Sequence, residues 1–296
     1  MRGKAIFLGL GLSVLATVAS AQAPGTGGLT PNDVYCSGVV TSESVPRDNY
    51  VITGEESNYK IVFDPGDFVF INKGSNQGVK AGDEFFVVRS VADPYNIDWN
   101  KWESAILRKM GTVWDDEGRI KVETVRADVS IARIEHACDS IQRGDTILPF
   151  AERPMPPLKS AENFDRFAPA NGKALAMVIT GKKFQAAVGR EDVVYVNLGA
   201  TQGVKVGDYF RIFRYQGTHE TVYQTPRYEF DQEYDMAIKD VNIVGFGSVP
   251  KKWNWNNTPR ESLGEGVVLR TGPNSATVMI TFSLREIYPG DYVELE

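Results

Sequence analysis

The sequence predicts an all-β protein in which a small SH3-like or similar antiparallel β-barrel occurs twice as a tandem duplication, behind a cleaved signal peptide. The first observation is a repeated motif: "INKGSNQGVKAGDEFFVVR" (71–89) returns, without a gap, as "VNLGATQGVKVGDYFRIFR" (196–214). The second is that β-branched and aromatic runs flank a glycine-rich turn in both copies, as in strand–turn–strand units. The third is an N-terminus typical of export.

Residues 1–23 have the pattern of a secretory signal peptide. Arg2 and Lys4 precede the apolar run "AIFLGLGLSVLATVA", and small residues at 19–23 offer a cleavage site. A retained membrane anchor is the alternative, but the run is short for a bilayer crossing, which needs about 20 residues. We therefore expect a periplasmic or extracellular protein whose mature N-terminus, residues 24–33, is flexible. No later segment is apolar enough to span a membrane.

Composition indicates a globular protein without a nucleic-acid surface. The chain is 42% hydrophobic and 11% aromatic, and about 270 mature residues suggest two domains. Loss of residues 1–23 removes two positive charges and changes the formal charge from −6 to −8. Because there is no basic cluster, we expect no nucleic-acid partner.

A second pair of matching blocks sets the domain boundaries. Residues 118–145 align with residues 264–291 without a gap, and "VITG" occurs at 51–54 and again at 178–181. The repeated motif and this second block are separated by about 21 more residues in the second copy. The segment between them, here called the central excursion, is therefore longer there. The predicted units are 34–150 and 165–296, and they are joined by a proline-rich linker at 151–164, which is expected to be extended and semi-stiff.

The repeated turn is interpreted as structural. Glycine accommodates the positive φ that tight connections require, and an aspartate after it can accept backbone N–H bonds. The lone valines Val79 and Val204 are expected to fill the barrel ends, and "NKWESAILRKM" (100–110) is the best candidate for a short helix. The predicted turn residues are Gly74, Gly78, Gly82 and Asp83 in the first unit and Gly199, Gly203, Gly207 and Asp208 in the second.

Cys36 and Cys138 are the only cysteines. An even number of cysteines in an exported chain favours a disulfide, here within the first unit. Two separate buried thiols are the alternative. A nucleophilic pair with His136 is disfavoured, because no third catalytic partner accompanies it.

The sequence predicts no catalytic, cofactor or metal site. A phosphate-binding P-loop needs GxxxxGK[ST] at the start of a helix, whereas "GSNQGVKAGD" precedes a strand. "WDDEGR" (114–119) clusters three carboxylates but lacks the spacing of a calcium loop, so we interpret it as a hairpin tip, with calcium binding as the alternative. His136 and His219 fall in different units, which disfavours a zinc site or a catalytic triad.

Tryptophan residues mark the two excursions. Trp99 and Trp102 lie in the first excursion, and Trp253 and Trp255 lie two apart in "KKWNWNN" of the second. If exposed, they suit contact with a protein or stacking on sugar rings. If buried, they cover the barrel ends. We take these four residues as candidate partner or glycan contacts.

The repeated blocks resemble a known kind of periplasmic domain. "DFVFINKGSNQGVKAGDEFFVVR", "DVVYVNLGATQGVKVGDYFRIFR", "SIARIEHACDSIQRGD" and "ATVMITFSLREIYPGD" are similar to the C-terminal domain of the flagellar-assembly T-protein, found around the basal body. They also resemble β-domains that accompany LysM modules in Gram-negative exported proteins. The resemblance covers about half of the mature chain and implies a small periplasmic β-domain. It implies no site residues.

These observations predict a non-enzymatic periplasmic or envelope protein that acts by protein–protein contact as a scaffold, assembly factor or ring component. Its expected partners are envelope proteins, with self-association included. The alternative is a carbohydrate-binding module for peptidoglycan or exopolysaccharide. A hydrolase would need a carboxylate pair or a metal that the sequence does not display.

Overall fold

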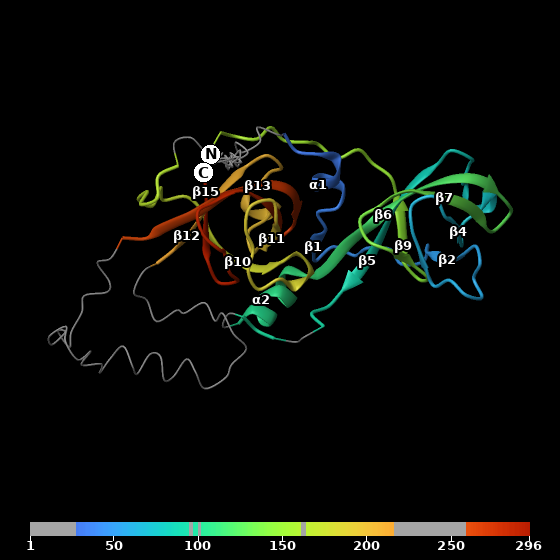
Figure 1. The fold of residues 1–296 in the computed structure, drawn as a ribbon, viewed down its shortest axis with the longest axis horizontal. Coiled ribbons are helices and arrows are strands. Elements are labelled where there is room, and N and C mark those ends of the chain that lie inside the picture. The colour runs from blue at the N-terminus through green and yellow to red at the C-terminus, as the bar shows by residue number, and fades with distance from the viewer. Residues whose placement is uncertain (1–27, 95–96, 100–101, 161–163, 216–258) are drawn as a thin grey trace, which may run out of the picture.

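The computed structural model describes residues 28–94, 97–99, 102–160, 164–215 and 259–296. The predicted signal peptide, His219, and the candidate contacts Trp253 and Trp255 lie outside these residues. The described chain is mostly β, as predicted, and forms two units side by side (Figure 1). No helix within the described ranges is both long and apolar enough to cross a membrane.

The first unit is built on a path of six antiparallel strands in the order β2-β4-β7-β6-β5-β9. An isolated bridge between Tyr50 and Thr146, with a 2.9 Å bond from the Val51 N–H to the Asp145 carbonyl, joins the two ends of the path. A seventh strand, β1, pairs with β6, and the short β3 and β8 pair with each other. The strands are β1 (Val39–Thr41), β2 (Val51–Gly54), β3 (Val62–Phe63), β4 (Phe68–Ile71), β5 (Glu84–Val91), β6 (Thr112–Val125), β7 (Ser130–Ala137), β8 (Ile141–Gln142) and β9 (Thr146–Pro149).

The second unit is a closed antiparallel barrel of six strands in the order β10-β11-β14-β13-β12-β15. Its chain order and strand order are the same as those of the six-strand path in the first unit. The strands are β10 (Leu175–Gly181), β11 (Val193–Val196), β12 (Tyr209–Arg214), β13 (Glu261–Gly272), β14 (Ser275–Ser283) and β15 (Tyr292–Leu295).

The pairing registers of the two units also agree residue by residue. Each irregularity of the first unit, such as the one between Val87 and Val88, has its counterpart in the second, here between Ile212 and Phe213. Because a one-residue slip would turn every side chain to the opposite face, the agreement places equivalent residues at equivalent positions. Matched pairs include Phe68–Arg133 with Val193–Met279, Phe85–Pro149 with Phe210–Leu295, and Gly118–Ala137 with Gly264–Ser283.

The QGVK motif forms the same turn in both units. A short 3₁₀ helix, η1 (Ser75–Gln77) or η3 (Ala200–Gln202), ends at a glycine with positive φ: 82° at Gly78 and 88° at Gly203. Asp83 and Asp208 each accept a backbone N–H bond within the following turn, at 2.9 and 2.8 Å.

The expectation of a positive φ at Gly74 and Gly199 is wrong. Their φ angles are −134° and −141°, which any residue adopts. Glycine is required there because neighbouring backbone is so close: an added Cβ would lie 2.3 Å from the Arg126 carbonyl oxygen or the Ser275 nitrogen.

The cores of the two units are separate. Val79 is buried in the first barrel and Val204 in the second, each immediately after its turn. A further buried cluster joins the units: Val40 and Val113 of the first pack on Ile179 and Tyr195 of the second. Helix α2 (Glu103–Met110), close to the predicted position, lies against β10.

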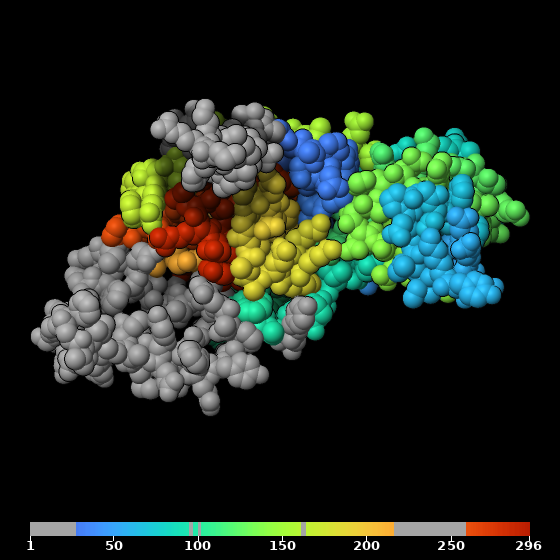
Figure 2. All heavy atoms as spheres, viewed as in Figure 1, coloured from blue at the N-terminus to red at the C-terminus, as the bar shows by residue number. Residues whose placement is uncertain are grey.

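An N-terminal segment fills the space between the units. Helix α1 (Pro31–Tyr35) begins inside the range predicted to be flexible, and its Val34 is buried against the second barrel. Strand β1 follows and pairs with β6, while Ser275 and Thr277 of the second barrel donate hydrogen bonds to the carbonyls of Val40 and Gly38. Figure 2 shows this dark blue segment between the green first unit and the yellow-to-red barrel.

The proline-rich segment does not hold the units apart. It has no helix or strand in its described part, as expected, but it lies on the surface of both units. Arg153 makes a two-pronged ion pair with Asp116 of β6, at 2.8 and 2.9 Å, and Leu158 packs beside Tyr209 of β12. The units are in direct contact, and the N-terminal segment and this segment each contact both of them.

Candidate functional site

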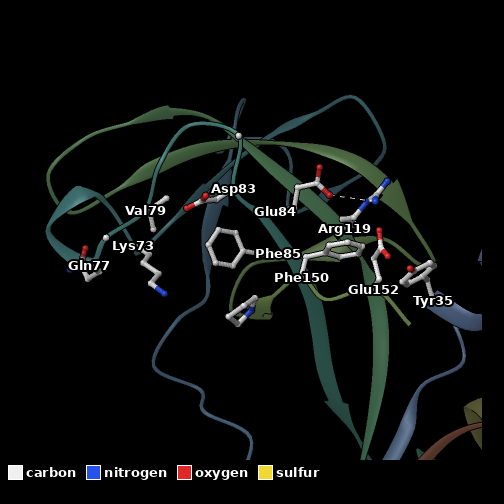
Figure 3. A pocket seen from close by; sticks show the side chains of 13 residues that line it. Tyr35, Lys73, Gln77, Val79, Asp83, Glu84, Phe85, Arg119, Phe150 and Glu152 are labelled. Atoms are coloured by element: carbon white, nitrogen blue, oxygen red, sulfur yellow. Dashed lines mark ion pairs between the residues drawn. The ribbon is translucent and has the colours of Figure 1, made fainter. Parts of the chain in front are cut away.

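A groove lies at one end of the first unit, next to the QGVK turn (Figure 3). Its volume is about 830 Å³, within the range of binding sites, and it is open to solvent. The turn supplies one side, and β6 and the chain after β9 supply the other. We call this hollow the first-unit groove; it is lined by Tyr35, Lys73, Gln77, Gly78, Val79, Gly82, Asp83, Glu84, Phe85, Arg119, Pro149, Phe150 and Glu152.

Aromatic rings form one wall of the first-unit groove. Phe150 packs on Phe86 with ring centroids 4.8 Å apart and on Tyr35 at 5.8 Å. Tyr35 comes from helix α1, so the N-terminal segment completes the wall. Phe150 and Tyr35 are only partly buried, which leaves ring surface available to a ligand.

Charges of both signs border these rings. The Arg119 guanidinium lies 5.1 Å from the centre of the Phe150 ring and 3.4 Å from the Glu84 carboxylate. Lys121 lies 3.6 Å from the same carboxylate, so two cations share one anion. On the far side, the Lys73 ammonium lies 5.6 Å from the ring of Phe85. Arginine and aromatic side chains are enriched where proteins bind one another.

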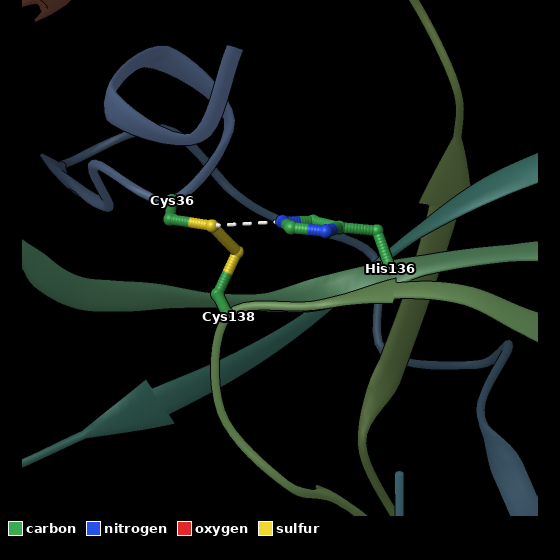
Figure 4. A group of neighbouring side chains, drawn as sticks. All are labelled: Cys36, His136 and Cys138. Carbon is green, nitrogen blue, oxygen red and sulfur yellow. Dashed lines mark hydrogen bonds between the residues drawn. A yellow bond between two sulfur atoms is a disulfide. The ribbon is translucent and has the colours of Figure 1, made fainter. Parts of the chain in front are cut away.

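A smaller hollow of about 400 Å³ shares Tyr35, Arg119 and Phe150 with the groove and reaches the disulfide. The predicted Cys36–Cys138 bond is confirmed, with Cα atoms 5.4 Å apart. It joins the end of α1 to the chain after β7 (Figure 4).

His136 lies beside this disulfide, with its Nε2 3.4 Å from Cys36 Sγ and 3.1 Å from the side-chain oxygen of Asn32. Cys36, His136 and Cys138 are the one group in the described chain whose side chains bring three possible metal ligands within 4.8 Å. Because the two sulfurs are bonded to each other, neither is a thiolate, and the group does not fit a metal ion.

The tryptophans of the first excursion lie elsewhere. Trp99 is half-buried, and its backbone N–H donates to Glu103 at 2.7 Å. Trp102 precedes α2 with a left-handed backbone and is 64% exposed. Neither residue lines the first-unit groove.

The interpretation of "WDDEGR" as a hairpin tip is wrong. These residues lie inside the 14-residue strand β6, and Asp115, Asp116 and Glu117 are buried where the two units meet. Three adjacent carboxylates are buried because β1 and the second barrel cover this part of the strand.

The three carboxylates differ in how their charge is balanced. Burial disfavours ionisation of Asp116, but Arg270 and Arg153 outweigh burial and lower its pKa. Burial raises the pKa of Asp115, against the opposing effect of Lys182 and Lys183.

The pKa of Glu117 is strongly raised. Burial raises its pKa to about 8, although the Arg89 guanidinium lies 3.2 Å from Oε2. Within the described structure, that oxygen receives no hydrogen bond. The three carboxylates therefore bear on the stability of the interface between the units.

An arginine–aspartate ion pair that occurs at the same place in both units was not predicted from the sequence. Arg89 holds Asp145 through two hydrogen bonds of 2.7 Å, and Arg214 holds Asp291 through two of 2.6 Å. Both aspartates follow a glycine and also accept a backbone N–H of their turn. The signal was present, since an arginine ends the repeated motif in both units.

Comparison of the sequence with protein-family models and with curated proteins finds no match. The arrangement of side chains at the first-unit groove is therefore the main guide to function.

Proposed function

We propose that the chain is an exported, non-enzymatic protein of the periplasm or extracellular face that acts by protein–protein contact, as a scaffold, assembly factor or ring component of an envelope machine. The first-unit groove carries this proposal. It combines partly exposed aromatic rings with charged side chains of both signs, which suits the recognition of a polypeptide.

The location rests on the sequence and is compatible with the disulfide. The first 23 residues have the three-part pattern of a signal peptide. Disulfides persist in oxidising compartments, and Cys36 is bonded to Cys138. The T-protein resemblance of the repeated blocks points to the same compartment.

We further propose that the units arose by tandem duplication of one SH3-like or similar barrel. The matching strand orders, registers and strand irregularities support a common origin. Duplication leaves two copies of one frame, and their surfaces are then free to diverge. In this proposal the first copy provides the contact surface.

Photo-crosslinking in the native envelope tests the contact function. A photoreactive residue at Glu152, which lines the groove, is compared with one at Glu123, an exposed position of the same unit outside the groove lining. We expect a discrete protein adduct, identified by mass spectrometry, from position 152 only. Equal adducts from both positions, or none from either, contradict the proposal.

Carbohydrate binding is the second candidate, because partly exposed aromatic rings such as Phe150 also stack on sugars. It is separated by retention on purified cell-wall glycan. Retention that is lost in a Trp253→Ala/Trp255→Ala variant or a Phe150→Ala variant favours the carbohydrate-binding module and overturns our first choice.

A further inference from the structure

In the second unit, the end of the barrel beside the QGVK turn is covered by the chain itself. Residues 156–159 (PPLK), here called the proline segment, lie over it and form neither helix nor strand. Pro156 is buried, and it lies 3.4 Å from the position that a Cβ on Gly207 would take. The Lys159 backbone N–H donates to the Tyr209 hydroxyl at 2.6 Å.

Charge complementarity holds the end of the proline segment. The Lys159 ammonium lies 4.2 Å from the centre of the Tyr209 ring and forms an ion pair with Glu296. Glu265 is a second carboxyl group close enough to interact with Lys159: burial and Glu296 raise its pKa, and Lys159 opposes that rise. The second unit thus displays a bound proline-containing ligand that belongs to its own chain.

The equivalent end of the first unit is uncovered. The backbone N–H of Phe150 donates to the Glu84 carbonyl at 3.0 Å, and that of Glu296 donates to the Tyr209 carbonyl at 2.9 Å, which fixes the correspondence of these positions. A Cβ on Gly82 would meet no atom within 4 Å, in contrast to Gly207. Counterparts of Gly207, Tyr209, Glu265 and Glu296 are Gly82, Glu84, Arg119 and Phe150, and all four line the first-unit groove.

We propose that the first-unit groove binds an extended, proline-containing segment of a partner protein, in the position that the proline segment occupies on the second unit. Proline suits this role because its extended conformation is already favoured before binding, and aromatic-lined grooves bind such segments. Phe150 and Tyr35 supply the aromatic wall.

The side chains of the first-unit groove also specify how the partner differs from the proline segment. In the first unit, Arg119 occupies the position of Glu265, which attracts Lys159 in the second unit. Phe150 occupies the position of Glu296, which forms an ion pair with Lys159. A lysine at this place would be repelled by the Arg119 guanidinium, whereas an acidic residue would be attracted by it. The Glu84 carboxylate, at the place of Tyr209, is already paired with both Arg119 and Lys121. The partner segment therefore carries an acidic side chain at the place of Lys159.

This inference rests on the proposed contact function and is tested separately with peptides on the full mature chain. The probes are residues 153–160 (RPMPPLKS), the charge-reversed RPMPPLES, and RSMSSLES, in which serine replaces the three prolines. Binding is followed by fluorescence polarisation. We expect RPMPPLES to bind at least about fivefold more tightly than RPMPPLKS, with little binding of RSMSSLES.

Variants locate the binding. Phe150→Ala should weaken the binding of RPMPPLES by about tenfold or more, which corresponds to about 1.4 kcal/mol. Arg119→Ala, which retains the Phe150 ring, should remove the preference for RPMPPLES over RPMPPLKS. Tyr59→Ala is the control, because Tyr59 is 93% exposed on the same unit and does not line the groove.

Equal binding of the serine peptide, no binding of either proline peptide, or binding that Phe150→Ala and Arg119→Ala leave unchanged overturns the inference. The contact function then still stands if position 152 crosslinks to a discrete partner, and it falls if that crosslink is also absent.

Discussion

Replacing Glu117 by glutamine should stabilise the protein at alkaline pH and leave it nearly unchanged at pH 5. The side chain is 2% exposed, lies where the two units meet, and faces Asp115, Asp139 and Asp145 as well as Arg89. Glutamine preserves the shape of the side chain and can still present an oxygen to Arg89. It removes the charge and replaces one carboxylate oxygen with an amide NH2 group.

The size and sign of the expected change in the free energy of unfolding follow from the pKa of Glu117, which burial raises from 4.5 to about 8. Because the folded protein binds this proton more tightly than the unfolded chain, the free energy of unfolding falls as pH rises from about 4.5 to about 8. Each unit of difference between the folded and unfolded pKa values corresponds to about 1.4 kcal/mol. The free energy of unfolding can therefore fall by at most about 4 kcal/mol between pH 5 and 8.5. Relaxation around buried charges reduces such penalties, and we expect the variant to gain about 2 kcal/mol at pH 8.5.

Urea denaturation of the oxidised protein at pH 5 and pH 8.5 measures this gain. Glu123→Gln is the matched control, because Glu123 lies on the same strand but is exposed. The reasoning is refuted if Glu117→Gln lowers the free energy of unfolding at pH 8.5, or if its effect is the same at both pH values.

Three further changes test the structure by urea denaturation. Removal of the Cys36–Cys138 disulfide, which spans 102 residues, should lower the free energy of unfolding by about 2–4 kcal/mol, and an unchanged midpoint would contradict this. Asp116→Ala should cost about 3–5 kcal/mol because it leaves two arginines without their buried partner, so a loss below about 1 kcal/mol would be unexpected. Gly74→Ala should cost more than Gly78→Ala, because a Cβ at Gly74 meets a carbonyl oxygen at 2.3 Å, whereas Gly78 has free space and only its positive φ, which costs about 1 kcal/mol. The reverse order would refute the close-approach argument.

The sequence predicted the β class and the disulfide, because both depend on local or countable features. Alternation of apolar residues sets strands, and two cysteines in a chain with a predicted signal peptide allow one intramolecular pair. The short helix was also found, since "ESAILRKM" has strong helix formers between a tryptophan and Gly111. These features do not depend on how distant segments pack.

Features made by contacts between the units were not predictable in this way. "WDDEGR" has the composition of an exposed turn, yet Asp116 is buried because Arg153 and Arg270 approach it from segments 37 and 154 residues away. The range 24–33 contains glycine and proline, yet the helix that begins at Pro31 docks because Val34 finds an apolar surface on the second barrel. Contacts between segments that are distant in the sequence determine both the burial of Asp116 and the docking of the helix.

The first-unit groove was not predicted from the sequence for the same reason, because distant segments form it. Its aromatic wall combines Tyr35 of α1 and Phe150 after β9, both packed on the buried ring of Phe86 of β5, and no spacing rule brings these residues together. The tryptophans drew attention in the sequence because of their size, whereas the groove depends on three rings that are unremarkable individually. A comparison of the two repeats could have found part of it, since Phe150 and Arg119 replace Glu296 and Glu265 at matched positions.

The position of the disulfide gives it a role at the interface between the units as well as in the first unit. Cys36 lies within the N-terminal segment between the units, at the end of α1, and Lys182 of the second barrel donates to the Cys36 carbonyl. The Tyr195 hydroxyl, also from the second barrel, donates to the carbonyl of Ser37 at 3.3 Å. Cys138 ties this segment to the end of β7, so the same bond that closes a long loop also holds α1, and with it Tyr35, against the first-unit groove. The groove therefore depends on the N-terminal segment for its shape, and the second barrel that positions this segment contributes to the contact surface without lining it.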